Sequence, residues 1–256
     1  MKRARVAFAG AIHDATPHRD GLQLADGRVL AEDAVVWLPP VEPLGTILAL
    51  GLNYAEHAKE LAKELTTTAK DEPLVFLKGP NTLIGHRGQT RRPNGVGFMH
   101  YECELAVVIG RSTKNVKRAD AMAHVAGYTV ANDYAIRDYL ENYYRPNLRV
   151  KNRDGCTALG PWLVDAADVP DPGALDLSTH VNGKLVQHGN TRDLVTGTAE
   201  LIEYLSSFMT LAPGDVILTG TPEGVIDVQP GDEVVCEIEG IGRLVNTIVG
   251  DESFGR

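Results

Sequence analysis

The 256-residue sequence predicts a β-rich α+β fold. Short apolar and β-branched runs outnumber the segments with helical periodicity, and turn signals such as Asp26-Gly27 and Asn182-Gly183 separate neighbouring runs. Strand-like and helix-like segments do not alternate as they do in a domain built on a parallel sheet. These observations favour a β-rich α+β fold over a Rossmann-type fold.

Two regions are expected. Residues 1–45 are predicted to form a small N-terminal β-rich region, because two strand-like runs flank the Asp26-Gly27 turn signal. Pro39, Pro40 and Pro43 then make a stiff connector, which is a plausible boundary. Residues 46–256 are predicted to form one larger domain.

The larger domain is expected to mix strands with a few helices. Strands are predicted over residues 45–53, 73–78, 100–110, 126–133, 216–220 and 233–240, with a hairpin over 177–189. Helices are predicted over 54–65, 117–125 and 198–209. Asn53 can cap the first helix, and Glu56 can complete a capping box.

The composition excludes several classes of protein. The formal net charge of −9 argues against general nucleic-acid binding. No apolar run approaches the roughly 20 residues of a membrane helix, and the N-terminal sequence lacks the pattern of a signal peptide. Three cysteines far apart, with no CxxC motif, are expected to be reduced thiols in a cytoplasmic protein.

Two glutamates lie on one face of a predicted apolar strand. Glu102 and Glu104 are two residues apart, so both side chains point the same way. Charges about 7 Å apart repel by roughly 2–3 kcal/mol at an effective dielectric near 20. A hard divalent cation can offset this repulsion. The alternative is a solvated strand end, as expected for Glu237 and Glu239, which have the same spacing.

A third carboxylate strengthens the metal hypothesis. Asp133 ends another predicted strand. Two strand glutamates and a strand-end aspartate can occupy one face of an octahedron and leave three positions for water or a chelating substrate. The alternative is an aspartate that caps a turn or helix.

His57 and Glu60 are three residues apart on a predicted helix and therefore share a face. A carboxylate beside an imidazole orients the ring and raises its basicity, as a general base requires. The alternative is an exposed histidine on a charged helix.

A basic segment stands out in this acidic chain. Arg137, Arg145, Arg149, Lys151 and Arg153 are interspersed with tyrosines, which suggests a surface that binds small carboxylates. The alternative is a solvated or subunit-contact loop. Separately, the "LTGTPEG" turn offers the Thr221 hydroxyl and backbone N–H groups to an anion, although it is not a P-loop.

Six motifs together resemble the fumarylacetoacetate hydrolase family over roughly residues 46–250. They are "LGLNYAEHAKE", "PLVFLKGPN", "HYECELAVVIG", "AGYTVANDYAIRD", "VNGKLVQHGNT" and "LTGTPEGV". The resemblance implies a mixed β-sandwich roll of the C-terminal type in that family, a homodimer, and Mg²⁺ or Mn²⁺.

The resemblance also implies residue roles. It places the metal on Glu102, Glu104 and Asp133. The residues expected to be catalytic are His57, Glu60 and Lys151. The residues expected to contact substrate are Asn53, Tyr54, Lys78 and Thr221, with Arg137, Arg145 and Arg149 as candidates for distal carboxylates.

Within the family, the segment from Asn132 to Gly155 resembles the branch that degrades homoprotocatechuate (4-hydroxyphenylacetate). Its members decarboxylate 5-carboxymethyl-2-oxo-hex-3-ene-1,6-dioate and isomerise 2-hydroxyhepta-2,4-diene-1,7-dioate. The expected substrate is therefore a small anionic 2-oxo dicarboxylate that chelates the metal. The metal is expected to stabilise the negative charge of a dienolate. This chain carries one catalytic module, whereas the related bifunctional enzymes carry two in tandem. We therefore expect either a paralogous partner subunit or a single module that performs both steps.

Two alternatives remain at this point. The first is C–C hydrolysis of an acylpyruvate or fumarylacetoacetate-type substrate, or oxaloacetate decarboxylation, with a water activated by His57 and Glu60. Leu140 weakens this hypothesis, because acylpyruvate hydrolases carry glutamine seven residues after the metal aspartate. The second is a protein that binds metal and anions without catalysis.

Overall fold

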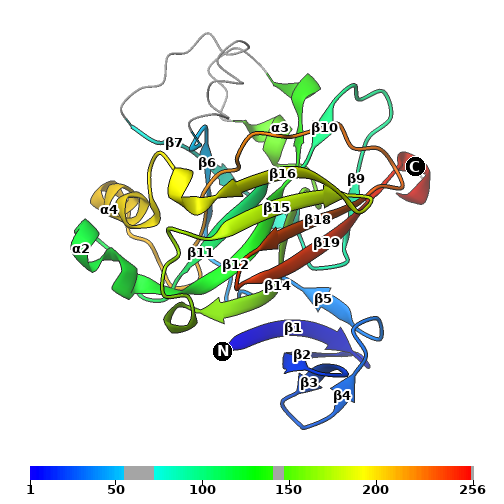
Figure 1. Cartoon of the computed structure of the whole chain (residues 1–256), viewed down its shortest axis with the longest axis horizontal. Coiled ribbons are helices and arrows are strands. Elements are labelled where there is room, and N and C mark those ends of the chain that lie inside the picture. The colour runs from blue at the N-terminus through cyan, green and yellow to red at the C-terminus, as the bar shows by residue number, and fades with distance from the viewer. Residues whose placement is uncertain (55–71, 141–146, 255–256) are drawn as a thin grey trace.

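A computed structural model describes residues 1–54, 72–140 and 147–254 (Figure 1). In these ranges a large mixed sheet packs against a smaller one, and the predicted β-rich α+β class is confirmed. The large sheet has the hydrogen-bonded order β4 (Val29–Leu30), β3 (Gly21–Leu24), β2 (Ala11–His18), β1 (Lys2–Phe8), β14 (Thr157–Asp165), β12 (Val125–Asp133), β11 (Cys103–Ile109), β17 (Val216–Leu218), β6 (Ile47–Gly51) and β7 (Leu74–Lys78).

Shorter elements complete the architecture. β5 (Val36–Leu38) pairs with β1, and β8 (Leu83–Ile84) pairs with β14. The second sheet has the order β16 (Lys184–Asn190), β15 (Asp176–Val181), β18 (Glu233–Ile238), β19 (Gly242–Val249) and β9 (Gln89–Arg91), while β10 (Met99–His100) pairs with β13 (Ala135–Ile136). Within the described residues the helices are α2 (Arg118–Ala121), α3 (Leu148–Lys151) and α4 (Thr198–Phe208), with 3₁₀ turns η1 (Pro80–Thr82), η2 (Met122–His124), η3 (Arg137–Tyr139), η4 (Ala166–Asp168), η5 (Thr191–Asp193) and η6 (Asp251–Phe254).

β11 is the centre of the core, because it is buried on both faces. Leu105, Val107 and Ile109 pack in the main hydrophobic cluster, which also includes residues of the second sheet. Ala106 and Val108 point the other way, into a separate cluster with residues of β6, β12 and β17. A strand covered on both sides is a rigid support for polar side chains at its first residues.

Both expected hairpins form, with Leu22 opposite Leu30 in one and Val181 opposite Lys184 in the other. The predicted strand over 100–110 is divided, since β10 ends at His100 and β11 begins at Cys103. The helix predicted over 54–65 lies largely outside the described residues.

The N-terminal strands continue the large sheet. β1 pairs with β2 and β5 and also with β14, where Lys2 lies opposite Val164. Trp37 packs edge-on against Trp162, with ring centroids 5.4 Å apart. The division of the chain after residue 45 stays a prediction. Among the described helices, none has the length and apolar character needed to cross a membrane.

Candidate active site

Three carboxylates meet where β11 begins and β12 ends. Glu102 immediately precedes β11, Glu104 is its second residue, and Asp133 is the last residue of β12. The two strands are antiparallel, and the Asp133 N–H donates to the Glu102 carbonyl oxygen over 2.9 Å. The start of one strand and the end of the other therefore lie side by side. One carboxylate oxygen from each residue lies within 4.8 Å of the others.

Two buried lysines offset this negative charge. The Lys151 ammonium lies 2.7 Å from Glu102 Oε2 and 3.0 Å from Asp133 Oδ2. The Lys78 ammonium lies 2.5 Å from Asp133 Oδ1. Burial alone would lower the pKa of Lys151, but the Asp133 and Glu102 carboxylates outweigh it and raise that pKa above its usual value. Lys151 therefore stays charged at neutral pH.

Glu104 forms no ion pair with a lysine or arginine among the described residues. Its side chain is fully buried, and Oε2 accepts a 2.6 Å hydrogen bond from the Gly220 N–H. Its Oε1 atom is buried and has no hydrogen-bond donor in the described part of the chain. Burial and the carboxylates of Asp133 and Glu102 raise the pKa of Glu104 well above its usual value. An unpartnered buried carboxylate oxygen beside two other carboxylates fits a divalent cation.

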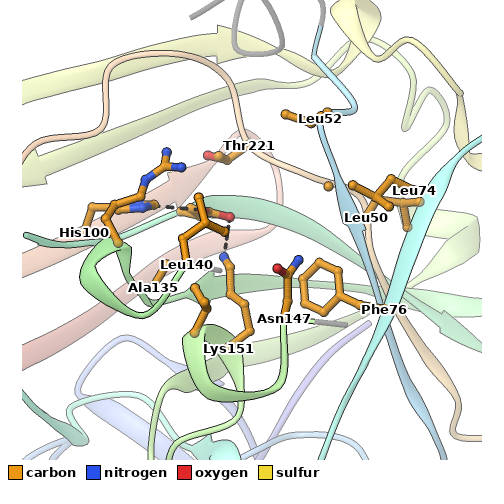
Figure 2. A pocket seen from close by; sticks show the side chains of 14 residues that line it. Leu50, Leu52, Leu74, Phe76, His100, Ala135, Leu140, Asn147, Lys151 and Thr221 are labelled. Carbon is orange, nitrogen blue, oxygen red and sulfur yellow. Dashed lines mark ion pairs between the residues drawn. The ribbon is translucent and has the colours of Figure 1, made fainter. Parts of the chain in front are cut away.

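A cavity opens beside the carboxylates (Figure 2). Its wall has a polar part and an apolar part, and the lining residues are Leu50, Gly51, Leu52, Leu74, Phe76, His100, Glu102, Ala135, Arg137, Leu140, Asn147, Val150, Lys151 and Thr221. Figure 2 shows Lys151 rising from α3 with its ammonium directed at a carboxylate, while Leu50, Leu74 and Phe76 line another side. The cavity can therefore hold an anionic group next to an apolar carbon chain.

His100 is a cavity residue that sequence reasoning missed. Its Nδ1 lies 3.0 Å from the Tyr101 carbonyl oxygen and 3.6 Å from Glu102 Oε1, and its Nε2 is buried. Burial lowers the pKa of His100 to about 3, so the imidazole ring is uncharged near neutral pH. The available signal was the alternation of His100, Glu102 and Glu104, which the continuous strand predicted from the sequence would place on one face.

The structure brings some predicted residues to the cavity and places others elsewhere. Arg137, Lys151 and Thr221 line it together with Glu102. Arg149 is exposed on α3, and its guanidinium lies 4.0 Å from the centre of the Tyr139 ring. His57, Glu60 and Arg145 lie outside the described residues.

Three predicted substrate contacts have other neighbours in the structure. The Asn53 amide donates to the carbonyl oxygens of Thr196 and Thr219, over 3.0 and 2.9 Å, so it ties two loops together. Tyr54 is buried and forms a bridge with Leu194. Lys78 is buried behind Asp133 and is not part of the described cavity wall.

Comparison with known proteins agrees with this architecture. The sequence model described as "Fumarylacetoacetate (FAA) hydrolase C-terminal" matches residues 46–249. A 4-hydroxyphenylacetate degradation bifunctional isomerase/decarboxylase from Salmonella dublin is 58% identical over 239 residues, which are 91% of this chain and 54% of that protein. The chain thus spans about half the length of the isomerase/decarboxylases to which it is similar.

Two solved structures are similar over nearly the whole chain. A 5-carboxymethyl-2-hydroxymuconate delta-isomerase from Mycobacterium smegmatis is 36% identical, with a TM-score of 0.84 and coverage of 98% of this chain and 99% of that one. A maleylpyruvate hydrolase from Sphingobium sp. SYK-6, solved with manganese(II) and pyruvate, is 27% identical, with a TM-score of 0.82 and coverage of 98% and 99%. The chain belongs to the fumarylacetoacetate hydrolase C-terminal family.

Proposed function

We propose that this chain is a divalent-metal-dependent lyase and isomerase that acts on an unsaturated 2-oxo dicarboxylate in 4-hydroxyphenylacetate (homoprotocatechuate) catabolism. The observation that carries the proposal is the carboxylate cluster of Glu102, Glu104 and Asp133, two of them buried, beside a cavity with cationic groups. Similarity to the Salmonella isomerase/decarboxylase and to the mycobacterial isomerase supports the choice of reaction.

The proposed cofactor is Mg²⁺ or Mn²⁺, held by Glu102, Glu104 and Asp133. Carboxylate oxygens are the ligands that both ions prefer, and the free Oε1 of Glu104 gives the cation a vacant ligand atom. When bound, the cation supplies Lewis-acid stabilisation of negative charge on the oxygen of a 2-oxo acid. The manganese and pyruvate in the maleylpyruvate hydrolase support this assignment.

The chain's own residues bind and orient the substrate. Lys151 holds Glu102 and Asp133 together and brings a positive charge to the cavity wall. We assign the binding of a substrate carboxylate to Arg137 and Thr221, because both line the cavity and can donate hydrogen bonds. The apolar side chains of Leu50 and Phe76 exclude water from the unsaturated carbon chain. We assign the proton transfer that ketonises the dienol to His57 and Glu60, as the sequence predicts.

A second candidate function is C–C hydrolysis, because one of the similar structures is a maleylpyruvate hydrolase. Leu140 argues against it. Its side chain lines the cavity at the position where acylpyruvate hydrolases carry glutamine, and a leucine cannot hold an attacking water by a hydrogen bond.

A product assay tests the proposal. The purified protein is incubated with 2-hydroxyhepta-2,4-diene-1,7-dioate, 5-carboxymethyl-2-oxo-hex-3-ene-1,6-dioate and maleylpyruvate, each with Mg²⁺, with Mn²⁺ or with a chelator, and products are identified by mass spectrometry. The expected product of the first dioate is an isomer of unchanged mass, and the second dioate is expected to lose CO₂. Both reactions are expected only when a divalent cation is present. Cleavage of maleylpyruvate in preference to both dioates would instead establish the hydrolase.

Assembly forms the last part of the proposal. We infer a cytoplasmic homodimer, and we expect either one module to perform both steps or a paralogous subunit to supply one of them. Assays of the two steps with this chain alone separate these possibilities.

A further inference from the structure

A buried chain of hydrogen bonds leads from the second sheet to the cavity. Thr179 on β15 and Gln187 on β16 are directly opposite each other, and both side chains are buried. The Thr179 hydroxyl donates to Gln187 Oε1 over 2.7 Å. Gln187 Nε2 then donates to Thr221 Oγ1 over 3.0 Å and to the Pro222 carbonyl oxygen over 2.8 Å.

The orientation of the Gln187 amide follows from its partners. The Pro222 carbonyl oxygen is only an acceptor, so the amide atom beside it must be the nitrogen. That nitrogen has two hydrogens and no lone pair to offer, so its second partner, Thr221 Oγ1, must accept. Three of the four hydrogen-bonding positions of the amide are then used, which fixes the orientation of the Gln187 side chain.

This arrangement determines which hydrogen bonds the Thr221 hydroxyl accepts and which it donates. Because Thr221 Oγ1 accepts from Gln187, its own hydrogen must point elsewhere, and it donates no hydrogen bond to any residue that the structure describes. Thr221 is 2% exposed and lines the cavity, so its hydrogen is free for a ligand there (Figure 2). A carboxylate can only accept hydrogen bonds, so a hydroxyl fixed as a donor recognises it.

We propose that Gln187 is a positioning residue that holds Thr221 as a hydrogen-bond donor toward a carboxylate bound in the cavity. The inference rests on the proposed function, because it takes the ligand of the cavity to be a carboxylate. Thr221 touches the ligand, and Gln187 acts through it. Without Gln187, no donor holds the Thr221 hydroxyl in this orientation, and its lone pairs can turn toward the anion.

A double-mutant cycle tests this coupling, with oxalate as the probe. Oxalate affinity is measured by calorimetry at saturating Mn²⁺ for the wild-type protein, Gln187→Met, Thr221→Val and the double variant. Each single variant is expected to bind oxalate about 10-fold more weakly than the wild type, because it loses the contribution of one hydrogen bond to a charged group. The double variant is expected to match Thr221→Val alone.

Two further variants separate positioning from packing. Thr221→Ser keeps the hydroxyl and is expected to retain most of the affinity. Thr129→Val removes a fully buried hydroxyl that is not part of the described cavity wall, and it is expected to leave oxalate binding unchanged. If Gln187→Met does not fold, Thr179→Val replaces it in the cycle, because this variant removes the hydrogen bond to Gln187 Oε1. Thr179→Val is expected to lower the affinity for oxalate only when Thr221 is present.

The outcomes are distinct. Independent losses that multiply in the double variant would show that Gln187 does not act through Thr221 and would overturn the inference. Wild-type protein that fails to bind oxalate would overturn both the inference and the carboxylate site. Coupled losses of oxalate binding, in a protein that turns over neither dioate, would support the inference and contradict the proposed function alone.

Discussion

At the scale of single residues, Lys151 has two effects on the carboxylate cluster. Its ammonium bridges Glu102 and Asp133 at 2.7 and 3.0 Å, so it stabilises the cluster when no cation is bound. The same positive charge repels a divalent cation placed beside those carboxylates. Lys151 therefore stabilises the metal-free protein while it weakens the attraction for metal.

Replacing Lys151 separates these effects. Lys151→Met is expected to destabilise the metal-free protein by about 3–5 kcal/mol, because buried carboxylates lose their cationic partner. Mn²⁺ is then expected to raise the melting temperature of the variant more than that of the wild type, while turnover falls sharply. Unfolding monitored with and without Mn²⁺ measures the difference. An equal Mn²⁺-induced shift in both proteins would show that the ammonium does not compete with the cation.

At the scale of elements, the turn after β17 fixes Glu104. Gly220 has φ = +93°, a conformation that favours glycine, and its N–H donates to Glu104 Oε2 over 2.6 Å. A Cβ atom at this position would lie 3.0 Å from the Asn53 Cβ. The turn thus needs glycine both for its backbone conformation and for close packing.

Gly220→Ala tests this element. The expected result is a loss of about 1–2 kcal/mol in the free energy of unfolding and a weaker Mn²⁺ affinity, because the Glu104 carboxylate loses its fixed donor. Gly183→Ala is a matched control, since Gly183 has φ = +78° and open space around it. The control should lose stability without losing Mn²⁺ affinity. Equal Mn²⁺ affinity in both variants would mean that the turn does not position Glu104.

Much of the element pattern could be predicted from the sequence, because strand periodicity and turn residues are local signals. The two hairpins and the strand-end position of Asp133 are examples. The break between β10 and β11 could not be predicted, since it depends on β10 pairing with β13 from a distant segment. The partners of Lys78 and Gln187 are also long-range contacts, which residue spacing does not reveal.

At the scale of the whole molecule, His86 contacts both the N-terminal strand β5 and the strand β19 of the second sheet. Its ring packs edge-on against Trp37, with centroids 4.8 Å apart, and its Nδ1 accepts from the Val245 N–H over 3.1 Å. Burial lowers the pKa of His86 to about 4, so the folded protein holds it neutral. An accepting Nδ1 agrees with the neutral form.

This histidine predicts acid sensitivity. The unfolded chain binds a proton at His86 near pH 6.5, whereas the folded chain resists protonation until about pH 4. The contribution of His86 to the free energy of unfolding is therefore fully present above pH 6.5. It falls by up to about 1.4 kcal/mol per pH unit as the pH is lowered from 6.5 to 4. Urea unfolding of wild type and His86→Gln across this range should show a shallower decline for the variant. Parallel curves would contradict the prediction.

The central claim for the whole molecule is that Glu102, Glu104 and Asp133 form one divalent-metal site. The most direct measurement is a calorimetric Mn²⁺ titration of the wild type and Glu104→Gln, with Glu237→Gln as the control. Glu237 has the same i, i+2 spacing to a second glutamate, but it is partly exposed and pairs with Arg243. We predict one Mn²⁺ per wild-type chain, an affinity about 100-fold lower or worse in Glu104→Gln, and no change in Glu237→Gln. Wild-type affinity in a folded Glu104→Gln protein would contradict the account.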